Sequence, residues 1–146
     1  MCQISNIKRD KVRELRVPMT VYKIVEQDPR DSSRIRSFYK LKRITIGETA
    51  NVQSFRKFKR AIKWKIDNSN LVSQFKVEGE GIHAYPNIDA VNNAVIRSRA
   101  ACDWNLAILE CEIPAWSGVI NGTWSDRKEV LTLVTNRIKY VRIIKL

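Results

Sequence analysis

The single histidine of the chain, His83, is the side chain with the clearest chemical potential. It lies in the segment Gly81-Ile82-His83-Ala84-Tyr85, just before a predicted helix. Glycine permits a close backbone approach and a helix start offers unpaired amides, so this corner could receive a ligand. A structural histidine that hydrogen-bonds the following turn explains the pattern equally well. Most serine or cysteine nucleophiles need a histidine base, and here only His83 could supply it.

Cysteine and glutamate side chains offer two further candidates. Cys102 could be a nucleophile, but its place on the apolar face of a predicted helix favours a buried structural thiol. Glu129 opens an apolar run and is the carboxylate best placed to act as a base or to orient a ribose, although exposed glutamates at strand starts are common. Cys2, Cys102 and Cys111 have no metal-ligand spacing, so we expect reduced thiols, no metal site and no cofactor.

Positive charge is unevenly spread along the chain, which has 146 residues and a formal net charge of +12. Residues 1–66 hold 18 basic and 6 acidic residues, whereas residues 67–146 hold 9 of each. This asymmetry predicts an electropositive surface that attracts phosphates, with a merely well-solvated basic surface as the alternative. Gly79-x-Gly81 is too short for a phosphate-binding loop, so side chains and helix ends would have to hold phosphate.

Alternating residue patterns of the kind found in β-strands predict that most elements of the chain are strands. Strands are expected over residues 19–25, 106–113, 130–135 and 138–144, and residues 35–46 also have an extended pattern. Asn121-Gly122 is the strongest short hairpin signal and should join residues 116–120 to 123–125. A helix is expected from about 88 to 101, with Asn87 before it and Asp89 in its first turn.

Residues 54–66 allow two assignments. The apolar positions Phe55, Phe58, Ile62 and Ile66 have helical spacing, which would place six basic residues on the other face. Ile62, Trp64 and Ile66 also alternate with lysines, as in a strand. We favour a helix or helical turn that runs into extended chain. Such a basic amphipathic segment can bind membranes or RNA, or can be an ordinary helix with a solvated basic face.

The predicted order of elements is strands, then one or two helices, then strands again. This order predicts an α+β fold with a mostly antiparallel sheet. The length suits one domain over residues 1–146, in which residues 1–17 form either a mobile basic arm or a short helix ended by Pro18. No run approaches 18 apolar residues and no signal-peptide core follows Met1. We therefore expect a cytoplasmic protein that does not associate with membranes.

Five short motifs resemble those of short, mostly uncharacterised phage and prophage proteins. They are Met1-Cys2, Tyr22-Lys23, Gly81-Ile82-His83-Ala84-Tyr85, Ile113-Pro114 and Gly122-Thr123. Their shared order covers most of the chain except residues 50–78. The resemblance implies a protein that acts in the cytoplasm of an infected host cell.

The chain also resembles the ADP-ribosyltransferase-like fold in two late elements. They are the segment Gly79-Glu80-Gly81-Ile82-His83-Ala84 and the strand start Glu129-Val130-Leu131, followed by the closing segment 137–141. Tyr22-Lys23 lacks the glycine and the usual His or Arg of that fold, and His83 stands where tyrosine is expected. The resemblance therefore implies binding of an ADP-ribose-like nucleotide more than catalysis.

Charge and resemblance together lead us to expect a phage-type binding protein without enzymatic activity, which sequesters a small phosphorylated ligand such as a host immune nucleotide signal. Lys or Arg side chains would bind phosphate, tyrosines would stack on a base, and histidine would add a hydrogen bond. The expected ligand-binding residues are Tyr22, Lys23, Arg36, Tyr39, Lys40, His83 and Tyr85.

Two alternatives remain open. Residues 34–66 could bind DNA or RNA, because Phe38, Tyr39, Phe55, Phe58 and Trp64 are interleaved there with basic residues. The side chains expected to contact nucleic acid are Arg56, Lys57, Lys59, Arg60, Lys63 and Trp64. Alternatively, the chain could be an active mono-ADP-ribosyltransferase that uses Glu129. The sequence also leaves homo-oligomer formation open.

Overall fold

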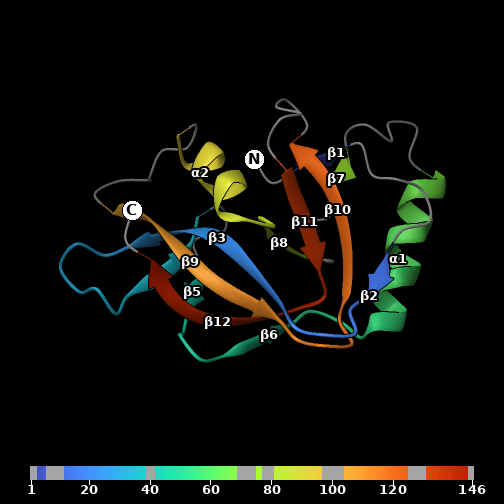
Figure 1. Ribbon diagram of the computed structural model, residues 1–146, viewed down its shortest axis with the longest axis horizontal. Helices are drawn as coiled ribbons and strands as arrows, with labels where there is room; N and C mark the ends of the chain where they lie inside the picture. Colours follow the sequence, from blue (N-terminus) through green and yellow to red (C-terminus); the bar gives the residue numbers. More distant parts are fainter. Residues whose placement is uncertain are drawn as a thin grey trace.

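The computed structural model describes residues 3–5, 12–38, 42–68, 75–76, 81–96, 104–124 and 131–144. Two helices accompany two six-stranded sheets in these ranges, and every strand pair is antiparallel (Figure 1). The predicted α+β class is therefore confirmed. The strands divide between two sheets, whereas the sequence predicted one.

The first sheet has the strand order β7-β1-β10-β11-β8, and β2 also pairs with β10. Its strands are β1 (Gln3–Ser5), β2 (Arg13–Glu14), β7 (Phe75–Lys76), β8 (Ile82–Ala84), β10 (Gly118–Trp124) and β11 (Leu131–Thr135). The expectation of an arm or short helix before Pro18 is wrong for Gln3–Ser5, which form β1 and pair with β10, and for Arg13 and Glu14, which form β2 and pair with Val119 and Gly118 respectively. Residues 6–11 lie outside the described ranges.

The second sheet has the strand order β5-β4-β3-β9-β12-β6. Its strands are β3 (Met19–Gln27), β4 (Ile35–Ser37), β5 (Arg43–Ile44), β6 (Thr49–Asn51), β9 (Asn105–Ile113) and β12 (Arg137–Ile144). The strands predicted over 19–25, 106–113 and 138–144 are confirmed as β3, β9 and β12. Residues 35–46 hold two short strands that pair with each other rather than one extended run.

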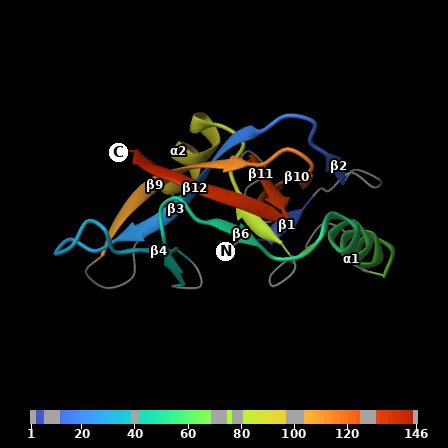
Figure 2. The same ribbon diagram turned by 90° about the horizontal axis from the view of Figure 1, so that it is seen from below.

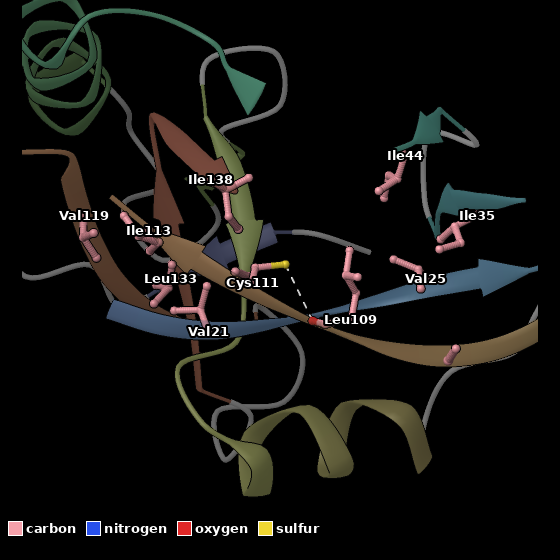
Figure 3. Packing of buried hydrophobic residues seen from close by; sticks show 12 residues of the cluster. Val21, Val25, Ile35, Ile44, Leu109, Cys111, Ile113, Val119, Leu133 and Ile138 are labelled. Carbon is pink, nitrogen blue, oxygen red and sulfur yellow. Dashed lines mark hydrogen bonds between the residues drawn. The ribbon is translucent and has the colours of Figure 1, made fainter. Parts of the chain in front are cut away.

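Buried residues of both sheets form one apolar core (Figure 3). Val21, Leu109 and Ile138 come from the second sheet, while Val119 and Leu133 come from the first, and all five are fully buried. The alternation of each strand places these residues on the face that looks toward the other sheet. The core therefore fixes how the two sheets lie against each other.

Asn136 is the single residue between β11 and β12, and there the chain passes from one sheet to the other. Its side-chain Oδ1 accepts a hydrogen bond from the Gly118 N–H at 2.8 Å, and its Nδ2 donates to the Gln53 carbonyl at 2.9 Å. Asn136 is buried, so these bonds compensate its desolvation. They also tie the start of β10 to the segment that leads into the first helix.

Helix α1 spans Phe55–Asn68. Ser54 caps it, because its Oγ accepts a hydrogen bond from the Lys57 N–H at 3.3 Å. Phe58 and Ile62 are fully buried and pack with Ile120 of the first sheet. The predicted extended tail within residues 54–66 is wrong, since the helix continues past residue 66. Of the two patterns in this segment, the helical spacing of the apolar residues predicts the structure, and the alternation of apolar residues with lysines does not.

Helix α2 spans Ile88–Ile96 and is capped as the sequence predicts. The Asn87 Oδ1 accepts a hydrogen bond from the Ala90 N–H at 2.8 Å. Val91 and Ala94 are buried in a cluster with Ile24 of β3. The expected helix extends to 101, but residues 97–101 lie outside the described ranges.

The predicted hairpin at Asn121-Gly122 is wrong. Both residues lie inside β10, where Asn121 pairs with Leu133 and Gly122 with Thr132. The strand continues because β10 has β11 on one side and both β1 and β2 on the other. Pairing with β11 along residues 119–123, and with β2 and β1 on either side of Asn121-Gly122, holds the chain extended and overrides the local turn preference.

Candidate functional site

Four of the expected ligand-binding residues lie where β3 of the second sheet meets the β8 segment of the first. The Tyr22 N–H donates to the Tyr85 carbonyl oxygen at 2.9 Å, and the Tyr85 N–H donates to the Tyr22 carbonyl at 2.7 Å. The Lys23 Nζ donates to the His83 carbonyl oxygen at 2.7 Å. We call Tyr22, Lys23, His83 and Tyr85 the seam corner. The structure brings these residues together, and their ligand-binding role stays a prediction.

The seam corner is half-buried and is partly committed to holding the fold together. Tyr22 and Tyr85 pack against the buried cluster of Ile24, Val91 and Ala94 between β3 and α2. Lys23 uses one of its three ammonium donors on a backbone carbonyl. A phosphate at this corner would have to compete with the contacts that Lys23 already makes, beside the segment that carries His83.

Arg36 does not join the seam corner. Its Nε donates to the Glu26 Oε1 at 3.1 Å, and its guanidinium carbon lies 3.9 Å from the centre of the Trp104 ring. Glu26 is fully buried, so Arg36 neutralises a carboxylate inside the protein rather than an external phosphate. Tyr39 and Lys40, also expected at the site, lie outside the described ranges.

Sequence reasoning missed this role of Arg36, although a signal for it exists. Gln27 to Ser33 has a turn-like composition, so a hairpin there brings residue 26 close to the segment that holds Arg34 and Arg36. In the structure β3 ends at Gln27 and β4 begins at Ile35, which places residue 26 opposite residue 36. Opposite charges on directly paired positions attract each other, so the pairing of Glu26 with Arg36 follows from the hairpin.

Cys111 is a free thiol in the core, close to the seam corner. Burial raises its pKa to about 12, and the nearby charge of Lys23 opposes that rise only in part. A protonated thiol is a poor nucleophile, so Cys111 is structural. Burial likewise raises the pKa of Tyr140 on β12 to about 12. Cys2, Cys102 and Glu129 lie outside the described ranges.

The second candidate site is the exposed face of α1, which we call the basic face. It consists of Arg56, Lys57, Lys59, Arg60 and Lys63, all exposed. Within the described ranges, no carboxylate forms an ion pair with any of them. The helix lies at the end of the molecule away from the turn between β3 and β4 (Figure 1 and Figure 2). Uncompensated positive charge therefore gathers at one end of the protein.

The arrangement of charges on α1 opposes the stability of the helix. Its first turn carries Arg56 and Lys57 and no acidic residue, although a helix N-terminus favours negative charge. Arg56 and Arg60, and likewise Lys59 and Lys63, form like-charge pairs four residues apart, each of which costs about 0.2–0.5 kcal/mol. An approaching anion would relieve this repulsion.

The aromatic residues expected to stack on bases are mostly part of the core. Phe58 is fully buried against the first sheet. Phe38 is half-buried beside the α2 cluster, and Phe55 is half-buried at the start of α1. Trp64 alone among the described aromatic residues of segment 34–66 has a largely exposed side chain, at 65%.

Comparisons with protein families, with curated proteins and with solved structures find no match for this chain. In the described part of the chain, no helix is both long and apolar enough to cross a membrane. Nor do three His, Cys, Asp or Glu side chains come together there as a metal-binding group.

Proposed function

We propose that the chain binds nucleic acid by placing the basic face of α1 against the phosphate backbone. The observation that supports this proposal is the set of five exposed cations without a carboxylate partner in the described ranges. Phe58 and Ile62 anchor the opposite side of the helix in the protein. The cations are thus held on a preformed surface, and binding does not require the helix to fold first.

The spacing of the cations suits a row of phosphates. Arg56, Arg60 and Lys63 follow one another at intervals of four and three residues, so they form one stripe along the helix. Seven residues of helix rise about 10 Å, and over that length of a duplex axis one strand carries about three phosphates, at roughly 3.4 Å of axis per phosphate. A contact of this kind is electrostatic and independent of base sequence.

The test compares two variants that remove the same charge from different places. Arg56, Arg60 and Lys63 are changed to Gln in the first, and Arg30, Lys42 and Arg43, exposed near the other end of the molecule, are changed to Gln in the second. Fluorescence anisotropy with labelled DNA should show a large loss of affinity for the first variant only. Equal losses would mean that net charge alone attracts DNA, and the proposal would fail.

The seam corner supports a second candidate function, the sequestration of a small phosphorylated ligand by a phage-type counter-defence protein. The favouring observation is that Tyr22, Lys23, His83 and Tyr85 come together from two sheets. Such a ligand should copurify, so the absorbance spectrum and the extracted small molecules of the purified protein should show a nucleotide. Lys23→Met should release it. A nucleotide-free preparation that binds DNA would contradict this second function.

A further inference from the structure

Trp116 is held in an unusual backbone conformation on the surface. Its φ angle is +68°, and it is the only residue other than glycine with a positive φ in the described ranges. This left-handed region disfavours any residue with a Cβ, and glycine or asparagine would occupy it at lower cost. The indole is nevertheless 54% exposed, so burial repays little of this cost. Strain of this kind at the surface points to a function of the side chain.

Four hydrogen bonds fix the turn that presents Trp116. The Trp116 N–H donates to the Leu15 carbonyl at 2.7 Å, and the Leu15 N–H donates to the Ser117 carbonyl at 2.9 Å. Arg137 donates to the Ala115 carbonyl at 2.7 Å through Nη2 and to the Ser117 Oγ at 3.1 Å through Nε. The peptide unit before Trp116 and the peptide unit after Ser117 are thus held in place, so the backbone that carries the ring is fixed before any ligand arrives.

A positive charge lies over the exposed indole. The guanidinium carbon of Arg16 is 5.0 Å from the centre of the Trp116 ring, at cation–π distance. Gly118, two residues after Trp116, lies against the first turn of α1: a Cβ at Gly118 would be 2.9 Å from Cδ2 of Phe55. Two residues of chain span at most about 7 Å. Trp116 therefore lies near the first turn of α1, which carries Arg56 and Lys57.

We infer that Trp116 is a stacking platform for an unpaired base, and that the basic face binds single-stranded nucleic acid in preference to duplex. This inference rests on the proposed function of α1. Bases inside a duplex are already stacked on their neighbours, whereas the bases of a single strand can stack on an exposed indole. Arg16 and the basic face supply positive charge. This charge favours a partner with a phosphate backbone over an apolar partner.

The test uses a labelled oligodeoxythymidine and a duplex of the same length, about 20 nucleotides, measured by anisotropy at about 0.1 M salt. Trp116→Gly removes the ring, and glycine tolerates the positive φ, so the variant should fold. Its affinity for the single strand should fall roughly 5- to 150-fold, while its affinity for the duplex stays unchanged. Trp116→Phe keeps a ring and should recover part of the loss.

The outcomes separate the two proposals. A wild-type protein that binds neither probe would overturn the function proposed for α1, and this inference with it. Binding of both probes that Trp116→Gly leaves unchanged, or lowers equally, would overturn the role of Trp116 but leave the function of α1 standing. A selective loss of single-strand binding, partly restored in Trp116→Phe, would support both proposals.

Discussion

Gly118→Ala tests the contact that holds α1, and with it the basic face, on β10. A Cβ at this position would lie 2.8 Å from Cδ2 of Phe58 and 2.9 Å from Cδ2 of Phe55. These separations are well below the roughly 3.5–4.0 Å that carbon atoms prefer. Phe58 is fully buried and cannot swing into solvent. We therefore expect overpacking to lower the free energy of unfolding by about 1–3 kcal/mol.

Urea denaturation followed by circular dichroism measures this loss. With a slope of about 1–3 kcal/mol per molar, the midpoint should fall by about 1 M. The double variant Phe55→Ala/Gly118→Ala removes one of the two close ring contacts. Its loss of stability should therefore be smaller than the sum of the two single losses. An unchanged midpoint for Gly118→Ala would show that α1 does not pack on β10 as described.

Two further predictions concern ionisable groups. Arg36→Leu removes the guanidinium that faces the buried Glu26 carboxylate. It should lower the free energy of unfolding by about 3 kcal/mol in the same urea assay. A change close to zero would contradict the buried pair. Burial raises the folded-state pKa values of Cys111 and Tyr140 from ordinary values of 9.0 and 10.0 to about 12. The folded protein therefore keeps protons that the unfolded chain loses, and stability should be fully present below about pH 9 and should fall as the pH rises from 9 to 12. Urea midpoints across that range should show the fall, which should be shallower in Cys111→Ala; a midpoint that rises above pH 9 would refute this account.

A local sequence pattern predicts an element correctly where the segments that pair or pack with that element favour the same conformation. The alternation over residues 19–25 identifies β3, and Asn87 marks the start of α2 because its side chain caps the helix in the expected way. Asn121-Gly122 misleads because the neighbours of β10, which are distant in sequence, decide its conformation. Residues 54–66 form a helix because burial of Phe58 and Ile62 outweighs the short alternation.

The candidate sites differ in the same way, because some of their residues follow from local spacing and others depend on long-range contacts. The exposed cations of α1 follow from helical spacing alone, since the buried positions fix the opposite face. That Arg36 pairs with Glu26 depends on the register of a hairpin, and the cluster at the seam corner depends on how two sheets meet. The strain at Trp116 has no local sequence signal, because long-range hydrogen bonds from Leu15 and Arg137 impose it.

The salt dependence of DNA binding tests the central claim most directly. Each phosphate contact contributes about 0.9 to the slope of log K against log salt concentration for a duplex, and about 0.7 for a single strand. The variant with Gln at positions 56, 60 and 63 should therefore show a slope shallower by about 2–3 units than wild type. An unchanged slope in this variant would contradict the assignment of the basic face as the phosphate-binding surface.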